Sequence, residues 1–201
     1  MRLLITGGAL LMTSLQASLI TDHGSVFFSP EDALEKRLVE LIDQESDSIQ
    51  MAIYCLTHQE IANALIRAKL RGVDVQVVVD KYSVKMKSPL SKMADAGIAV
   101  YVWDGQRLIN QKKESAIMHH KFCIFGQETL WTGSFNFTYR ASRIHHENAL
   151  VLKNPEMVSE FRKQFEVLLD EGSLPLRDYI PIKTSPFFQD KTETTLSKIG
   201  K

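Results

Sequence analysis

The sequence of 201 residues lacks a charge excess of either sign, because 24 lysines and arginines balance 24 aspartates and glutamates. Such a chain has no global electric field to attract nucleic acid or an anionic membrane, so any anion binding must be local. It also lacks an internal repeat. Its length suggests one domain, or one domain with short extensions, and its 44% of hydrophobic residues can form a sizeable core.

The sequence is poor in groups that form disulfides or hold metals. It has two cysteines, Cys55 and Cys123, each within an apolar run, and no C-x-x-C pair. Cysteines in such runs are more often buried thiols than disulfide partners, even in an exported protein. No residues have the spacing of a zinc site. We therefore expect no metal site and no cofactor.

An uninterrupted apolar run of the ~20 residues that a membrane span needs is missing. The N-terminus has one arginine, Arg2, before an apolar segment at residues 3–15, followed by the small residues Ala17 and Ser18. This order is typical of a secretory signal peptide. We expect residues 1–18 to be a signal peptide and the protein to be secreted or periplasmic. An uncleaved N-terminus that anchors the protein in a membrane, or an ordinary buried segment, are the alternatives.

Segments with the patterns of helices and strands alternate from Ser29 onward. Ser29-Pro30-Glu31-Asp32 predicts the start of a helix, and Thr57-His58-Gln59-Glu60 resembles a capping box that opens a second helix ending at Gly72. Strands alternating with helices predict an α/β fold with a sheet that is at least partly parallel. Further helices are expected around residues 89–96, 138–143 and 155–169, and strands at residues 49–55, 73–79, 98–103, 117–125, 128–132 and 148–152.

Two segments fall outside this alternation. Residues 104–115 are polar and are expected to form a long loop, which is more often functional or mobile than structural. Beyond Glu171 the chain becomes rich in proline, serine and threonine, and we expect a surface extension with a frayed end. The predicted domain therefore covers residues 26–170, with a C-terminal extension at residues 171–201.

The residues with useful chemistry are concentrated in residues 118–138, MHHKFCIFGQETLWTGSFNFT. Residues i and i+2 of a strand share a face, so His119 and Lys121 are expected to project together. An imidazole beside an ammonium suits an anion, because the lysine neutralises charge while the histidine attacks or donates a proton. Gly133-Ser134-Phe135-Asn136 adds a tight turn with a hydroxyl and an amide that can bind phosphoryl oxygens.

Glu147 is the candidate carboxylate to hold the imidazole of His119 in one tautomer. Each of these patterns is ordinary when taken alone, but together they predict a phosphoryl-transfer site that needs no metal. His120 points to the other face of the expected strand and is expected to be structural. His145 and His146 either line the site or face solvent.

His119-x-Lys121 followed by Gly133-Ser134-x-Asn136 resembles the motif H-x-K-x4-D-x6-G-S-x-N of the phospholipase D superfamily, with the same spacing. The segments VFFSP, IQMAIYCLT and HENALVL are similar to those of short members with a single motif, namely bacterial Nuc-type endonucleases and the mitochondrial cardiolipin hydrolase/Zucchini group. The resemblance covers residues 26–169. It implies a phospholipase D-like fold, in which helices sandwich a mixed β-sheet.

The resemblance also implies a mechanism. His119 would attack phosphorus to give a phosphohistidine, and a second histidine would protonate the leaving oxygen and then activate water. Lys121 and Asn136 would bind the phosphoryl oxygens, Ser134 would support them, and Glu147 would orient His119. Because this chain has one motif, the second histidine must come from another subunit, which implies a homodimer with one shared active site.

Gly126 stands where the motif of the family has aspartate. It falls between two expected strands, where glycine suits a hairpin turn with positive φ. Either the chain is an inactive member, or the aspartate of the family is a structural support and the chain is active. We expect activity, because the histidine, lysine, serine, asparagine and glutamate all remain at matching positions.

The motif does not distinguish a nuclease from a phospholipase. Basic residues that could form a groove for a phosphate backbone are Lys81, Lys85, Lys87, Lys92, Arg107, Lys112 and Lys113. Solvated surface loops are the alternative reading of these residues. We expect an endonuclease acting on DNA or RNA, with phospholipase D or cardiolipin hydrolase as the alternative. A catalytically inactive dimer that binds nucleic acid or lipid is the third candidate.

Overall fold

A computed structural model of the chain describes residues 20–21, 24–109 and 112–179. In this part of the chain one sheet has nine strands in the order β1-β2-β10-β9-β8-β3-β4-β5-β11, and β3, β4 and β5 are parallel. The remaining neighbours are antiparallel. The strands are β1 (Ile20–Thr21), β2 (Gly24–Ser29), β3 (Ser48–Ile53), β4 (Asp74–Asp80), β5 (Ala99–Trp103), β8 (Lys121–Phe125), β9 (Thr129–Gly133), β10 (Glu147–Lys153) and β11 (Ser173–Pro175).

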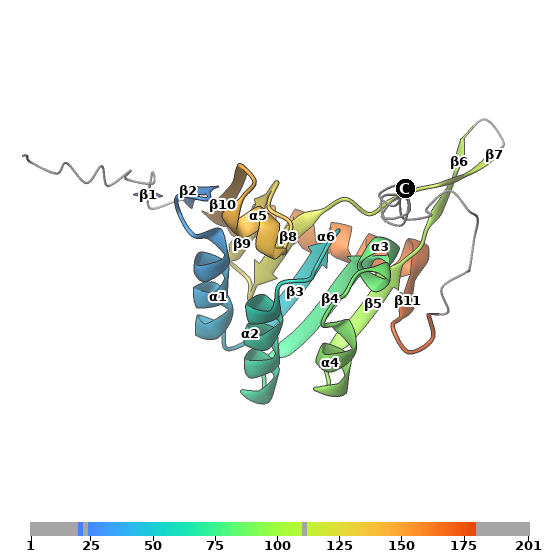
Figure 1. Cartoon of the computed structure of the whole chain (residues 1–201), viewed down its shortest axis with the longest axis horizontal. Coiled ribbons are helices and arrows are strands. Elements are labelled where there is room, and N and C mark those ends of the chain that lie inside the picture. Colours follow the sequence, from blue (N-terminus) through green and yellow to red (C-terminus); the bar gives the residue numbers. More distant parts are fainter. Residues whose placement is uncertain (1–19, 22–23, 110–111, 180–201) are drawn as a thin grey trace, which may run out of the picture.

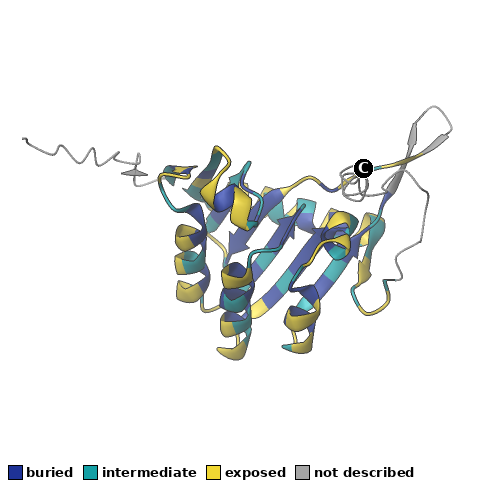
Figure 2. Cartoon of the chain, in the orientation of Figure 1, coloured by how far each residue is buried: buried dark blue, intermediate teal, exposed yellow. Residues whose placement is uncertain are grey.

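Helices cover both faces of the sheet, as Figure 1 shows. This arrangement confirms the predicted α/β fold with a mixed sheet sandwiched by helices. Buried residues fill the centre of the molecule, and the outer faces of the helices are exposed (Figure 2). The helices are α1 (Leu34–Gln44), α2 (Gln59–Leu70), α3 (Lys81–Lys85), α4 (Leu90–Asp95), α5 (Tyr139–Arg143) and α6 (Pro155–Gly172).

The core has two layers because the central strands are buried on both faces. Successive side chains of β4 alternate: Val77 and Val79 pack with α1, α2 and α4, whereas Val78 packs with α6. A strand between two helical layers needs apolar residues on both sides, which explains the run of valines. Cys55 and Cys123 are both buried free thiols, as predicted.

The topology brings several strand ends to one edge of the sheet. β8 lies antiparallel to β3, and Ile53 at the end of β3 pairs with Lys121 at the start of β8. β9 ends at the same edge, where Gly133 pairs with Ala149 of β10. The helices α3 and α5 lie at this edge (Figure 1). Residues that are far apart in sequence therefore meet there.

The starts of the first two helices differ from those predicted. Ser29 ends β2 and does not cap a helix, and α1 begins after Ala33, whose φ is 49°. The expected capping box at residues 57–60 is also absent, since the N-cap of α2, His58, makes no side-chain hydrogen bond. The backbone N–H groups of Thr57 and His58 instead donate to the carbonyl oxygen of Phe137, at 3.0 and 2.9 Å. Backbone N–H groups before α2 therefore bond to a residue distant in sequence, and not to side chains of the predicted capping box.

The segment at residues 104–115 is not the loop that was expected. It contains a β-hairpin of β6 (Gln106–Ile109) and β7 (Lys112–Ser115). The side chains of residues 106–113 lie outside the described ones, and with them the candidate groove residues Arg107, Lys112 and Lys113.

The two ends of the chain are described only in part. β11 pairs with β5, so the sheet extends beyond the predicted domain end at residue 170. The rest of the predicted extension, residues 180–201, and the predicted signal peptide at residues 1–18 lie outside the described residues. Among the helices that the structure describes, none is long and apolar enough to cross a membrane.

Candidate active site

The structure brings together all five side chains that were predicted from the sequence to form the site. They line one open pocket at the sheet edge where β8 begins and β9 ends. Besides Gly133, the residues that line this pocket are His119, Lys121, Ser134, Asn136 and Glu147.

His119 lies just before β8 and not within a strand, because the strand begins at Lys121 and not at residue 117 as predicted. Hydrogen bonds nevertheless fix the backbone on either side of it. The N–H of Met118 donates to Oδ2 of Asp80 at 2.8 Å, and Nζ of Lys121 donates to the carbonyl oxygen of His119 at 2.6 Å. The imidazole itself is exposed, so a rigid segment presents it to the pocket.

Tyr54, which directly follows β3, supports the same segment. Its backbone N–H donates to the carbonyl oxygen of His120 at 2.9 Å. Its ring meets the ring of His119 edge-on, with 4.5 Å between the centroids, and Nζ of Lys121 lies 5.3 Å from the centroid of the tyrosine ring. The aromatic ring therefore contacts both members of the His-x-Lys pair.

The electrostatics of the pocket favour a neutral imidazole. Lys121 is only 7% exposed, and desolvation lowers the pKa of its ammonium, while Glu147 opposes that shift. Desolvation, and then the positive charge of Lys121, lower the pKa of His119. The histidine thus stays unprotonated, as a nucleophile must be, to a lower pH than a free histidine would.

Gly133 is required by a close approach of two strands. A Cβ atom at this position would lie 2.2 Å from the carbonyl oxygen of Asn148, closer than any side chain allows. The next residue, Ser134, donates its backbone N–H to the same oxygen at 3.1 Å. This contact holds the serine hydroxyl beside β10.

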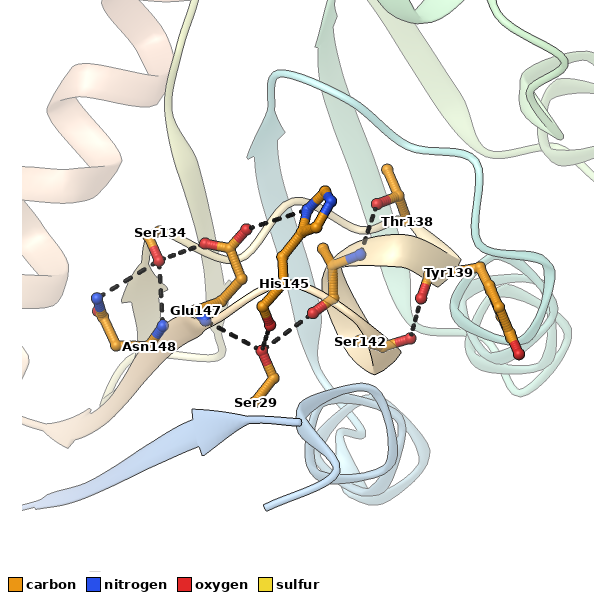
Figure 3. A network of polar contacts seen from close by, with 9 residues as sticks. Ser29, Ser134, Thr138, Tyr139, Ser142, His145, Glu147 and Asn148 are labelled. Carbon is orange, nitrogen blue, oxygen red and sulfur yellow. Dashed lines mark hydrogen bonds and ion pairs between the residues drawn. The ribbon is translucent and has the colours of Figure 1, made fainter. Parts of the chain in front are cut away.

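Glu147 was predicted to orient His119, but it does not contact this histidine by a hydrogen bond. Its Oε2 accepts a hydrogen bond of 2.5 Å from Oγ of Ser134, and its Oε1 lies 3.9 Å from Nδ1 of His145 (Figure 3). Among the described residues no hydrogen bond joins Glu147 to His119. The reason is the strand order: Glu147 begins β10 next to β9, which ends beside Ser134, whereas His119 precedes β8, one strand further away.

Ser29 is a second residue that the sequence reasoning misassigned. Its hydroxyl accepts the backbone N–H of Glu147 at 3.1 Å and lies within 3.0 Å of the carbonyl oxygens of Ala141 and His145 (Figure 3). Ser29 is 1% exposed, so these bonds are sheltered from water. It fixes the start of β10, and with it the carboxylate of Glu147.

Asp80 is a buried carboxylate that the sequence reasoning missed. Its Oδ1 accepts the N–H of Tyr82 and its Oδ2 that of Met118, both at 2.8 Å, so it joins α3 to the segment of His119. Burial raises its pKa, while these two N–H groups and Lys81 act in the opposite direction. An aspartate that directly ends the apolar strand VDVQVVVD was the available signal.

The other candidate histidines have different surroundings. His120 is exposed, and its ring contacts that of Phe122, at 5.5 Å between centroids; Phe122 packs with α6, so the ring of His120 lies on the other face from the pocket, as predicted. His145 and His146 are both exposed, and His145 also lines a neighbouring cavity. Asn136 is half-buried, and its Oδ1 has no hydrogen-bond partner among the described residues.

Gly126 occupies the turn between β8 and β9, as predicted, with a φ of 52°. Its N–H donates to the carbonyl oxygen of Ser48 at 2.9 Å, and its own carbonyl oxygen accepts from Arg162 at 2.7 Å. This turn lies at the end of β8 opposite to Lys121. The departure from the family motif is therefore remote from the pocket.

The lysines of the expected groove are only partly available. Lys81 forms an ion pair with Asp104, and Lys92 donates to Oδ1 of Asn63 at 2.9 Å. Lys85 and Lys87 are exposed. Within the described part of the chain, no group of three or more histidine, cysteine, aspartate or glutamate side chains could hold a metal ion.

Comparison with known proteins places this geometry in a family. The family model described as "Cardiolipin synthase, PLD-like domain" matches residues 38–169. The chain belongs to the phospholipase D superfamily. This finding confirms the predicted family, and the match covers both the His-x-Lys pair and the Gly-Ser-x-Asn turn.

Relatives within this superfamily have several names. A mitochondrial cardiolipin hydrolase of Chlamydomonas reinhardtii is 30% identical over 135 residues, which cover 67% of this chain and 56% of that protein. A phospholipase D of Rickettsia felis is 30% identical over 146 residues, covering 72% of this chain and 68% of that protein. The chain thus spans little more than half of the algal relative.

A solved structure supports the same assignment. The crystal structure of Nuc from Salmonella typhimurium, a phospholipase D family member, is 30% identical in sequence with a TM-score of 0.65. The similarity covers 76% of this chain and 97% of Nuc. The phospholipase D-like fold predicted from the motif is thereby confirmed.

Proposed function

We propose that this chain is a phosphodiester hydrolase that forms a phosphohistidine on His119, needs no metal, and acts on nucleic acid as an endonuclease. The observation that carries the proposal is the convergence of a nucleophile, a cation, an amide and a carboxylate on one open pocket. His119 directly precedes β8, and Lys121 begins that strand. Asn136 follows β9, and Glu147 begins β10. Their meeting supplies what transfer of a phosphoryl group requires.

In the first step a neutral ring nitrogen of His119 attacks phosphorus. A P–N bond forms, the P–O bond to the leaving group breaks, and the leaving oxygen takes a proton from a second histidine. In the second step that histidine takes a proton from water, the water oxygen attacks phosphorus and the P–N bond breaks. Lys121 and Asn136 stabilise the charge on the phosphoryl oxygens in both steps. Glu147 acts indirectly, through Ser134 and the field at Lys121.

The second histidine is proposed to be His119 of another subunit, so that a homodimer shares one active site. Subunit mixing tests this arrangement. Wild-type protein is unfolded and refolded with increasing amounts of His119→Ala, and hydrolysis is measured at constant total protein. A shared site predicts that activity falls as the square of the wild-type fraction, because mixed dimers are inactive. A fall in direct proportion to that fraction would show that each subunit works alone.

The proposed chemistry is tested with purified protein in excess EDTA. It is offered plasmid DNA, single-stranded DNA, RNA and phospholipid vesicles, with His119→Ala as the matched control. We expect cleavage of nucleic acid by the wild type and none by the variant, which should keep the same thermal unfolding midpoint because His119 is exposed. Activity that disappears on chelation and returns with Mg²⁺ or Zn²⁺ would overturn the proposal.

Hydrolysis of a phospholipid is the second candidate. It is favoured by the names of the relatives from Chlamydomonas reinhardtii and Rickettsia felis. The same set of substrates separates the two candidates, because release of a lipid headgroup from vesicles, without cleavage of DNA or RNA, assigns the chain to lipids.

A further inference from the structure

A second cavity, of about 340 Å³, adjoins the catalytic pocket. Asn136 lines both of them, so a ligand bound at the catalytic pocket can extend directly into the second cavity. Its volume lies within the ~300–1,000 Å³ that is typical of sites for small ligands. The phosphodiester chemistry described above uses none of its aromatic residues. These are Tyr54, Tyr82 and Tyr139.

Two of these rings form a stack that begins at the nucleophile. Tyr54 contacts the ring of His119 edge-on, and it lies parallel to Tyr82, with 5.2 Å between the centroids and 1° between the planes. Tyr82 is fixed by its backbone N–H, which donates to Oδ1 of Asp80 at 2.8 Å. A continuous aromatic surface therefore leads from the reacting group into the second cavity.

Two of the three tyrosine rings in this cavity, Tyr82 and Tyr139, are open to solvent. Tyr82 is 38% exposed and Tyr139 is 66% exposed, although both are large side chains that folding usually covers. Exposed aromatic rings beside a phosphate-binding site are the elements with which proteins stack bases of single-stranded nucleic acids. The alternation of phosphate and base along such a strand matches the adjacency of the two cavities.

The remaining lining distinguishes a base from a lipid chain. Polar groups of Thr57, Arg140 and His145 share the cavity with the tyrosines and Met86. An acyl chain offers these polar groups no hydrogen-bond partner in place of water. A nucleobase has a flat π-face for the tyrosines and hydrogen-bonding edges for the polar groups.

We infer that this cavity is a stacking subsite for one nucleobase of a single-stranded nucleic acid whose phosphate lies at His119. The inference rests on the proposed function, because it takes nucleic acid as the substrate. Every base has a π-face, so such a subsite selects single strands over duplexes without selecting a sequence. Tyr82 contributes the exposed end of the stack, and Tyr139 lines the same cavity.

Binding measurements test the subsite apart from catalysis. The full chain carrying His119→Ala is titrated into a fluorescent single-stranded oligonucleotide, and into an abasic oligomer with the same length and backbone charge. We expect the abasic oligomer to bind about five- to a hundredfold more weakly, as stacking of one base on an aromatic residue requires. Equal affinities for the two oligomers would overturn the inference without any need for a variant.

Variants of Tyr82 then locate the effect. Tyr82→Phe keeps a stacking ring and should retain the affinity, whereas Tyr82→Leu keeps an apolar side chain and should lose about tenfold or more for the oligonucleotide. The abasic oligomer should bind the leucine variant with the same affinity as it binds the chain in which Tyr82 is unchanged. Phe28→Leu, which removes an exposed ring on β2 that does not line the cavity, is the control for both oligomers. An equal loss for both oligomers would mean that Tyr82 is merely structural.

Two further outcomes separate this inference from the proposed function. Base-dependent binding that Tyr82→Leu abolishes, without cleavage of DNA or RNA by the wild-type protein, would support the subsite and refute the endonuclease. Cleavage of DNA or RNA by the wild-type protein, with base-dependent binding that Tyr82→Leu leaves unchanged, would support the endonuclease and refute the subsite. Loss of binding to cardiolipin vesicles in the leucine variant, with unchanged binding of the oligonucleotide, would assign the cavity to lipid and overturn the inference.

Discussion

Restoring the aspartate of the family motif is a direct test of whether Gly126 disables the site. Gly126→Asp places a side chain in a turn whose φ of 52° is left-handed, a region that aspartate tolerates better than most residues. Its Cβ would lie 3.6 Å from both carboxylate oxygens of Glu45. The substitution therefore brings two carboxylates together at a position where glycine allows the turn without strain.

The structure allows both effects to be estimated. Two like charges about 4 Å apart repel by about 1 kcal/mol in a watery environment, and the left-handed backbone adds about 1 kcal/mol. Replacing glycine also makes the unfolded chain less flexible, which stabilises the folded state by about 0.4–1 kcal/mol. The net result should be a free energy of unfolding that is lower by about 1–2 kcal/mol. The turn lies five residues from Lys121 along β8, about 16 Å at 3.3 Å per residue, and no side chain there can touch the phosphorus.

The assay measures kcat/KM on one phosphodiester and the free energy of unfolding in urea. Gly126→Asp should change kcat/KM by less than about tenfold, roughly 1.4 kcal/mol. Glu45→Gln is the matched partner, because a glutamine oxygen can still accept the N–H groups of Ser46 and Asp47. In the double variant about 1 kcal/mol of stability should return. An inactive wild type that Gly126→Asp activates would refute this reasoning and show that the chain is a decayed enzyme.

Three other predictions concern the pocket and the residues that support it. Glu147→Gln should lower kcat/KM by more than about tenfold, because it removes the negative charge that strengthens the hydrogen bond from Ser134 and stabilises the ammonium of Lys121; an effect no larger than that of Gly126→Asp would contradict this. Asp80→Asn should lower the urea unfolding free energy by about 1–3 kcal/mol, because an amide nitrogen cannot accept the second N–H, and unchanged stability would disprove it. The acidic limb of kcat/KM should lie below the usual histidine pKa of about 6.5, because desolvation and Lys121 keep His119 neutral; a limb above that value would contradict the assignment.

The features that local pattern encodes could be predicted from the sequence. The run of valines predicted β4, because a strand with helices on both faces needs apolar residues on both sides. The spacing of His119 and Lys121, followed by the Gly-Ser-x-Asn turn at residues 133–136, predicted the pocket, since two neighbouring strands bring these segments together. These parts of the site depend on residues close together in sequence.

The partners of the site residues could not be predicted in the same way. Ser29 matched the pattern of a helix cap, but its hydroxyl bonds across the sheet edge to Glu147 and α5. The partner of Glu147 is Ser134 because β10 adjoins β9, and the role of Asp80 depends on the arrival of Met118 beside β4. Strand order decides each of these contacts, and a single sequence does not reveal strand order through periodicity.

The position of β8 between β3 and β9 has a consequence for how activity appears during folding. Pairing of Ile53 with Lys121 closes a long loop that contains α2, β4, α4 and β5. Closing such a loop has a high entropic cost, and contacts between residues far apart in sequence form slowly compared with local helices. His119 and the start of β8 reach their positions only once this distant pairing exists. Recovery of hydrolysis after dilution from urea therefore follows closure of the sheet and lags behind recovery of the helical circular dichroism signal.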